Sequence, residues 1–121
     1  MTDTIADTFF ATYRRALLDR DAHAIADHYA VPALIEFPGQ AIAVTDAQQT
    51  LDFFASAVGQ YEGGHDTKAE IAVIAQTGHS VWADVAWYDD GERAERFVYQ
   101  LVDTDKGWKI AVLTPLELPV S

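Results

Sequence analysis

The sequence contains no cysteine among its 121 residues. This absence excludes a disulfide framework, a thiolate nucleophile and a cysteine-based zinc site. The four histidines show none of the spacings HxH, HExxH or HxxEH, so the chain has no local metal-binding motif. It also lacks a GxSxG nucleophile elbow, a P-loop and a GxGxxG turn after a strand. We therefore expect neither a metal nor any other cofactor.

Basic residues are few, because 8 Lys and Arg stand against 19 Asp and Glu, for a formal net charge of −11. Nucleic acids and anionic membranes bind clusters of Lys and Arg, so neither is an expected partner. No stretch approaches the ~20 apolar residues of a membrane span. The chain carries Asp3 and Asp7 where a secretory signal carries Lys or Arg. We expect a soluble, cytoplasmic protein.

Hydrophobic residues make up 50% of the chain and aromatic residues 12%, which is too apolar for a disordered acidic protein. A chain of this length forms one hydrophobic core. No linker, internal repeat or low-complexity segment divides the sequence. We therefore predict a single domain over residues 1–121.

Two helices are predicted in tandem at the start of the chain. Apolar residues spaced by three and four between Ile5 and Leu17 form one stripe, which is typical of an amphipathic helix. A second, short helix begins after the acidic cluster at 19–21, and Pro32 stops it. Its buried side is predicted to consist of Ala22, Ile25, Ala26 and Tyr29.

A third helix is predicted after residue 45. Thr45 and Gln48 fit a capping box, in which Thr45 bonds forward to a backbone N–H and Gln48 bonds back. Leu51 and Phe54 begin its apolar stripe, and the glycine pair at 63–64 ends it.

Six strands are predicted in the remaining sequence. A Pro-Gly turn at 38–39 separates two short apolar segments, which indicates a hairpin. From Thr67 the apolar period becomes two, and turn residues rich in Gly and Asp separate four longer segments. The predicted strands are Ala33–Phe37, Gln40–Val44, Lys68–Thr77, Ser80–Tyr88, Glu92–Asp103 and Gly107–Thr114. Helices and strands are segregated, so the fold class is α+β, with the helices on one face of the sheet.

Residues 9–17 (FFATYRRAL) and 21–29 (DAHAIADHY) resemble the opening of the nuclear transport factor 2-like superfamily, in its SnoaL-like branch. Residues 107–112 (GWKIAV) resemble its last strand, and the resemblance covers nearly the whole chain. It implies a cone, in which a strongly curved antiparallel sheet of about six strands wraps around three N-terminal helices on its concave face. Members include steroid isomerases, polyketide cyclases, dehydratases, epoxide hydrolases, pocket proteins and oligomerisation domains, and dimers packed through the sheet are common. Such a fold does not name an activity.

Two carboxylates stand in apolar runs and are candidate acid–base groups. Glu36 lies in ALIEF and Asp84 in VWADVAW. Apolar surroundings raise the pKa of a carboxyl group, which suits a general acid or base near neutral pH. The alternative is that strand alternation points both side chains outward, to solvent.

His28 and Tyr13 are the other two candidate catalytic residues. His28, on the second predicted helix, can project toward the mouth of the cone as an acid or base, or it can cap a helix end by bonding a carbonyl. Tyr13 lies on the apolar stripe of the first helix. Its phenol can donate a hydrogen bond to a carbonyl or enolate oxygen, or it can pack as a core residue.

Aromatic side chains are candidates for the walls of an apolar pocket, although most of them can equally fill the core. The predicted pocket residues are Phe9, Tyr29, Phe54, Trp87, Tyr99 and Trp108. Alternation places Trp82 and Trp87 on opposite faces of one strand. Both faces of the sheet are therefore apolar, and a second subunit is the simplest cover for the face without helices. We expect a homodimer that packs through the outer face of the sheet.

Two functions remain open from the sequence. The first is a dimeric protein that binds a small apolar molecule in a pocket without catalysis. The alternative is an enzyme of the isomerase, dehydratase or cyclase type, which transfers protons on a small apolar carbonyl or polyketide-like substrate. In the enzyme, Glu36 or His28 would be the base, and Tyr13 would stabilise enolate-like charge. No position matches the family's aspartate base by motif, so these roles rest on residue chemistry alone.

Overall fold

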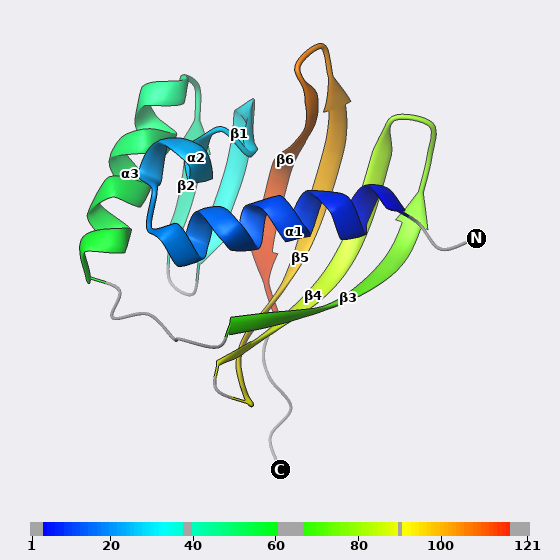
Figure 1. The fold of residues 1–121 in the computed structure, drawn as a ribbon. Coiled ribbons are helices and arrows are strands. Elements are labelled where there is room, and N and C mark those ends of the chain that lie inside the picture. The colour runs from blue at the N-terminus through cyan, green and yellow to red at the C-terminus, as the bar shows by residue number, and fades with distance from the viewer. Residues whose placement is uncertain (1–3, 38–39, 61–66, 90, 117–121) are drawn as a thin grey trace.

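The computed structural model describes residues 4–37, 40–60, 67–89 and 91–116. The helices are α1 (Thr4–Asp19), α2 (Ala22–Ala26) and α3 (Ala47–Gln60). The strands are β1 (Tyr29–Phe37), β2 (Gln40–Val44), β3 (Thr67–Gln76), β4 (Ser80–Asp89), β5 (Glu92–Thr104) and β6 (Gly107–Pro115) (Figure 1). The predicted α+β class is confirmed. Within the described ranges, no helix has the length and apolar character needed to cross a membrane.

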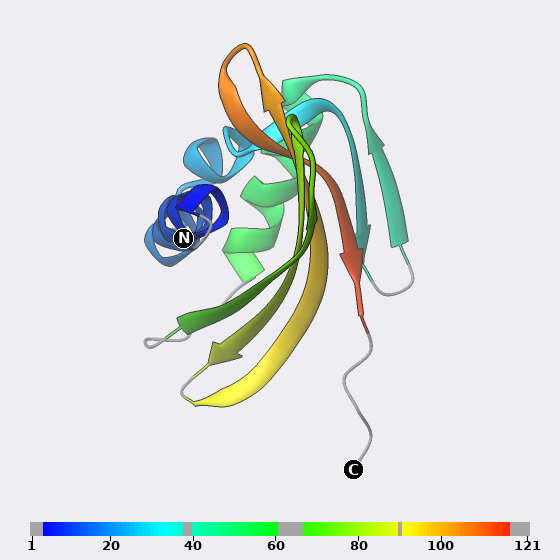
Figure 2. The same cartoon turned by 90° about the vertical axis from the view of Figure 1, so that its right-hand side faces the viewer.

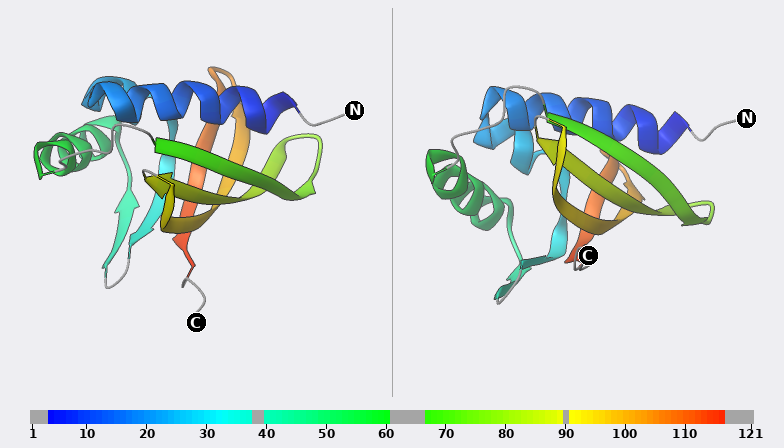
Figure 3. Two further views of the ribbon diagram at one scale, coloured as in Figure 1. Left: turned by 60° about the horizontal axis from the view of Figure 1, so that its bottom comes forward. Right: turned by 90° about the horizontal axis from the view of Figure 1, so that it is seen from below.

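The six strands form one curved sheet in the order β2-β1-β6-β5-β4-β3. Strands β3 to β6 are the predicted antiparallel meander, and α1 lies across the concave side of the sheet (Figures 2 and 3). One pairing differs from an all-antiparallel sheet, because β1 and β6 run parallel. Parallel neighbours need a long connection, and here α3 and the whole meander separate the two strands along the chain.

The second helix is shorter than its apolar pattern predicts, and Tyr29 belongs to β1. Asp21 caps α2 by accepting a hydrogen bond from the Ala24 N–H. The backbone then leaves the helix, because the Ile110 N–H donates to the His28 carbonyl at 2.8 Å. This pairing with β6 draws the next residue, Tyr29, into the sheet.

The capping box of α3 lies one residue later than predicted. Asp46, not Thr45, accepts a hydrogen bond from the Gln49 N–H at 2.9 Å. The Gln49 side-chain oxygen accepts in return from the Asp46 N–H at 3.2 Å. The shift follows from the start of the helix at Ala47. The predicted stop at 63–64 lies outside the described residues.

The hydrophobic core fills the space between α1 and the concave face of the sheet. Alternation along β4 turns Val81 and Val85 inward, where both are fully buried. Leu101 of β5 and Ile110 of β6 are paired neighbours on the same face, and they too are fully buried. Phe10 of α1 belongs to the same core cluster and is 1% exposed. These side chains of the concave face are therefore buried from solvent.

Candidate functional site

Tyr13 stands at the centre of a group of buried aromatic side chains. It lies on the inward stripe of α1 and is 3% exposed. Its ring centre lies 6.0 Å from that of Tyr29, 6.1 Å from that of Tyr99 and 6.2 Å from that of Trp87. These partners come from β1, β5 and β4. The structure thus brings together three predicted pocket residues around one predicted catalytic residue.

Two hydrogen bonds link these side chains in pairs. The hydroxyl oxygens of Tyr13 and Tyr29 lie 2.6 Å apart, and the Trp87 Nε1–H donates to the Tyr99 hydroxyl oxygen at 2.9 Å. We call these four residues the phenol cluster. Burial raises the pKa of all three tyrosines well above the ordinary 10.0. The phenols are therefore neutral hydrogen-bond donors at any physiological pH.

Each hydroxyl of the phenol cluster has one hydrogen-bond partner, and a hydroxyl can both donate and accept. Its three hydroxyl groups carry three protons. One of them is used between Tyr13 and Tyr29, and Tyr99 accepts from Trp87 without donating to any described residue. Two phenol protons therefore have no acceptor in the part of the chain that the structure describes. Buried donors without acceptors are uncommon in folded proteins.

Glu95 is a carboxylate whose charge acts on the phenol cluster. It pairs with Trp87 across β4 and β5, so it shares the inward face with Phe97 and Tyr99. Its charge raises the pKa of Tyr13 and Tyr99. Glu95 is exposed as a residue, yet the protein atoms around its carboxyl group desolvate it enough to raise its own pKa.

The sequence analysis did not single out Glu95, although a signal for it is present. Alternation from Glu95 through Phe97, Tyr99 and Leu101 puts one acid in line with two aromatic residues. The last three are buried on the concave face. The pattern alone does not say which face of the strand is concave, so the acid could not be placed.

His28 lies beside the phenol cluster but both of its ring nitrogens are engaged. Its Nδ1–H donates to the Ala24 carbonyl at 2.7 Å, and its Nε2 lies 3.0 Å from the Thr12 Oγ1. Its ring centre lies 5.4 Å from that of Tyr13. Burial lowers the pKa of His28, while the bond to the Ala24 carbonyl opposes that shift. This geometry matches the helix-capping alternative, and a catalytic role stays a prediction.

The two predicted carboxylates lie on the other face of the sheet. Asp84 alternates with the inward residues of β4 and binds Arg96 through both oxygens, at 2.9 and 2.5 Å. Glu36 pairs with Ala41 and alternates with Ile35, which is fully buried. The structure thus brings neither acid to Tyr13, and their proposed catalytic roles stay untested predictions.

The remaining predicted pocket residues extend the aromatic group in two directions. Phe9 stacks on Tyr13 with ring centres 6.1 Å apart. Phe54 of α3 reaches Tyr29, with ring centres 5.0 Å apart. Trp108 is half-buried and packs against the same core. All six predicted residues thus belong to the core around Tyr13 or border it.

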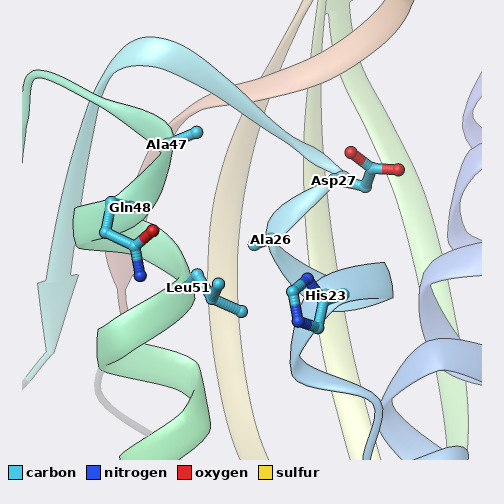
Figure 4. Close-up of a pocket in the computed structure, with 6 residues that line it drawn as sticks. All are labelled: His23, Ala26, Asp27, Ala47, Gln48 and Leu51. Carbon is cyan, nitrogen blue, oxygen red and sulfur yellow. The ribbon is translucent and has the colours of Figure 1, made fainter.

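A separate hollow of about 160 Å³ lies between α2 and α3. It is lined by His23, Ala26, Asp27, Ala47, Gln48 and Leu51. Figure 4 shows His23, Gln48 and Leu51 at the gap between the helices, with the Asp27 carboxylate turned away from it. Its polar side chains are all exposed, which is typical of a surface groove. Over the described residues, no three His, Asp or Glu side chains group to hold a metal ion.

The comparison with protein families decides the membership of the chain. A family model described as NTF2-like protein (DUF6841) matches residues 1–118. The chain belongs to this NTF2-like family. The resemblance to the nuclear transport factor 2-like superfamily is thereby confirmed, and the SnoaL-like branch stays a prediction. The search of curated proteins gave no match.

Solved structures show the same NTF2-like fold at low sequence identity. A ketosteroid isomerase-like protein from Erwinia carotovora atroseptica is 15% identical, with a TM-score of 0.69, over 95% of this chain and 96% of that one. A domain of unknown function with a cystatin-like fold from Nostoc punctiforme is 14% identical, with a TM-score of 0.71, over 99% and 81%. An NTF2-like protein of unknown function from Shewanella baltica is 14% identical, with a TM-score of 0.68, over 99% and 100%. Identities this low establish the fold alone.

Within this NTF2-like fold, the phenol cluster is the most distinctive chemical feature of the described residues. It combines neutral donors, aromatic walls and one neighbouring carboxylate on the concave face. Such a group can bind an acceptor oxygen, and beside a carboxylate it can also support proton transfer.

Proposed function

We propose that this NTF2-like protein binds a small, largely apolar molecule at the phenol cluster, through an acceptor oxygen of that molecule and without converting it. The observation that carries the proposal is the pair of phenol protons without a described acceptor. A buried donor without a partner costs about 1–3 kcal/mol. A ligand oxygen that accepts from Tyr99 and from the Tyr13–Tyr29 pair would remove that cost.

Acetophenone is a suitable probe, because it joins an aromatic ring to one carbonyl acceptor. The Trp87 indole N–H reports on the site, since it donates to the Tyr99 oxygen. In a ¹⁵N NMR titration we expect the Trp87 indole signal to move in a saturable manner, and Trp87→Phe assigns the signal. Tyr99→Phe should abolish or strongly weaken binding. The proposal fails if acetophenone leaves the Trp87 signal unchanged, or if Tyr99→Phe binds as well as the natural chain.

The second candidate function is acid–base catalysis on a carbonyl compound. The specific observation is the Glu95 carboxyl group, whose pKa burial raises, on the same face as phenol donors that can stabilise an enolate. In this mechanism Glu95 takes a proton from the carbon beside the carbonyl, and a phenol donates a hydrogen bond to the oxygen as negative charge develops. Glu95 then returns the proton to a carbon of the same molecule.

Proton exchange separates the catalytic function from binding alone. In D₂O, the enzyme would exchange the methyl protons of acetophenone for deuterium, and the loss of their ¹H signal measures the rate. Glu95→Gln should abolish the exchange and leave binding in place. An exchange rate equal to that of buffer would refute catalysis on this probe and leave the binding proposal standing.

The outer face of the sheet is proposed as the contact with a second copy of this chain. It carries Leu34, Trp82, Val98 and Val112 at positions that alternate with buried residues. The Asp84–Arg96 pair lies among them and neutralises both charges. The four side chains retain partial exposure, so a partner would complete their burial. Light scattering at micromolar concentration tests the dimer, and a monomeric mass would refute it.

The proposal includes a cytoplasmic location, with neither nucleic acid nor membrane among the partners. The net charge of −11 supports the exclusion of these anionic surfaces. Fractionation of cells that express the tagged chain tests it, and recovery in the membrane pellet would contradict it.

A further inference from the structure

We propose that the ligand of the phenol cluster carries a protonated amine, which pairs with Glu95, in addition to its acceptor oxygen. This inference rests on the proposed binding function and names the chemical class of the ligand, a small aromatic or apolar cation with a carbonyl or similar oxygen. It follows from the position of Glu95, from its surroundings and from the absence of an ion-pair partner for it among the residues that the structure describes.

Glu95 occupies the one acidic position on the inward face of β5 between residues 95 and 101. The register pairs Glu95 with Trp87 and Phe97 with Val85, and Val85 is fully buried on the concave face. The Glu95 charge acts on the hydroxyl groups of Tyr13 and Tyr99. A ligand whose oxygen binds the phenols therefore has this carboxylate within its electrostatic reach.

The carboxylate has no counter-charge in the described part of the chain. Glu95 forms neither a hydrogen bond nor an ion pair with a described residue. By contrast, the half-buried Asp84 on the opposite face is bound by Arg96 through both oxygens. Although Glu95 is exposed as a residue, the protein atoms around it desolvate its carboxyl group and raise its pKa. A cation beside the carboxylate would offset this desolvation. A ligand ammonium group supplies that cation.

The surroundings also favour a cation. The rings of Tyr13, Tyr99 and Phe97 lie next to one another, at centre distances of 6.1 and 6.0 Å, and the faces of such rings attract cations. The net charge of −11 draws cations toward the protein and repels anions at long range. A carboxylate ligand would meet Glu95 as a like charge.

Three acetophenones that differ only in their para substituent test the inference. The substituent is aminomethyl in the cation, hydroxymethyl in the neutral compound and carboxylate in the anion. Each is titrated into the protein at 0.15 M salt, which screens charges beyond about 8 Å, and the Trp87 indole signal reports binding. We expect the amine to bind about tenfold more tightly than the alcohol, as a partly desolvated ion pair does. The anion should bind most weakly.

Glu95→Gln locates the effect at this residue, and Asp105→Asn is its matched control. Both variants lose one negative charge, but Asp105 lies in the exposed turn between β5 and β6. The preference for the amine should disappear in Glu95→Gln and persist in Asp105→Asn. Equal binding of all three compounds, or a preference that survives in Glu95→Gln, would overturn the amine inference while the binding function stands. If none of the three moves the Trp87 signal, the proposed function itself fails.

Discussion

The Tyr13–Tyr29 hydrogen bond allows a prediction that separates a structural pair from two independent core residues. Each residue is changed to Phe, singly and together, so the ring packing is kept and only hydroxyl groups are lost. Tyr13 is 3% exposed and Tyr29 5% exposed. Neither oxygen can therefore turn to bulk water when its partner is removed.

The expected energies follow from this burial. A single change removes the 2.6 Å bond and leaves one buried hydroxyl without its partner, which costs about 1–3 kcal/mol. The double change replaces both polar groups with apolar ones of the same shape, which is close to neutral. The free energies of unfolding should therefore fall in each single variant and recover in the double variant. With a loss of about 1–3 kcal/mol in each single variant and almost none in the double variant, the coupling energy between the two sites should be about 2–6 kcal/mol.

Urea unfolding at one fixed protein concentration measures these differences. With a slope of about 2 kcal/mol per molar urea, a loss of 2 kcal/mol lowers the midpoint by about 1 M. The fixed concentration matters because dimerisation would shift every midpoint. If the two single losses in the free energy of unfolding add up in the double variant, Tyr13 and Tyr29 do not form this hydrogen bond. The number of phenol protons without an acceptor would then be wrong as well.

Three further predictions concern other parts of the molecule. Thr50 is 1% exposed, and its Oγ1 has no hydrogen-bond partner among the residues that the structure describes. Thr50→Val should therefore raise the free energy of unfolding by about 1–2 kcal/mol, and a lower free energy in urea unfolding would contradict this. Burial lowers the pKa of His28 from 6.5. As the pH falls, the unfolded chain therefore binds a proton on His28 at a higher pH than the folded chain does. Stability should then fall as the pH drops below about 6.5, and His28→Gln should flatten that fall in thermal unfolding; parallel pH profiles would contradict it. Val98→Lys places a charge on the outer face of the sheet and should yield a monomer by light scattering. Asp105→Lys, in the exposed turn, should stay dimeric. A dimeric Val98→Lys would exclude this face as the interface.

The sequence predicted the elements whose signals are local. The apolar period of two after Thr67, together with the turn residues, predicted β3 to β6. The apolar spacing of three and four predicted that Tyr13 lies on the buried side of α1. Alternation also separated Trp82 from Trp87, and β4 follows that division. These features need only neighbouring residues, so a local pattern is sufficient to identify them.

The features that were missed depend on contacts between distant segments. Tyr29 continues an apolar helical pattern, but its pairing with Ile110 of the last strand makes it part of β1. Asp84 stands in an apolar run, whereas Glu95 is followed directly by Arg96, so the sequence drew attention to Asp84. Only the curvature of the sheet places Glu95 on the concave side and Asp84 on the outer side. A pattern of period two assigns residues to two faces but does not say which face receives α1.

The central claim is that the buried phenols donate to a ligand oxygen. The ¹³C chemical shift of carbonyl-labelled acetophenone tests it most directly, because this shift moves downfield as the carbonyl accepts stronger hydrogen bonds. We predict a downfield movement from the value in water when the protein is added, and its loss in Tyr99→Phe. An upfield movement would place the carbonyl in an apolar site without donors, and would contradict the role assigned to the phenol cluster.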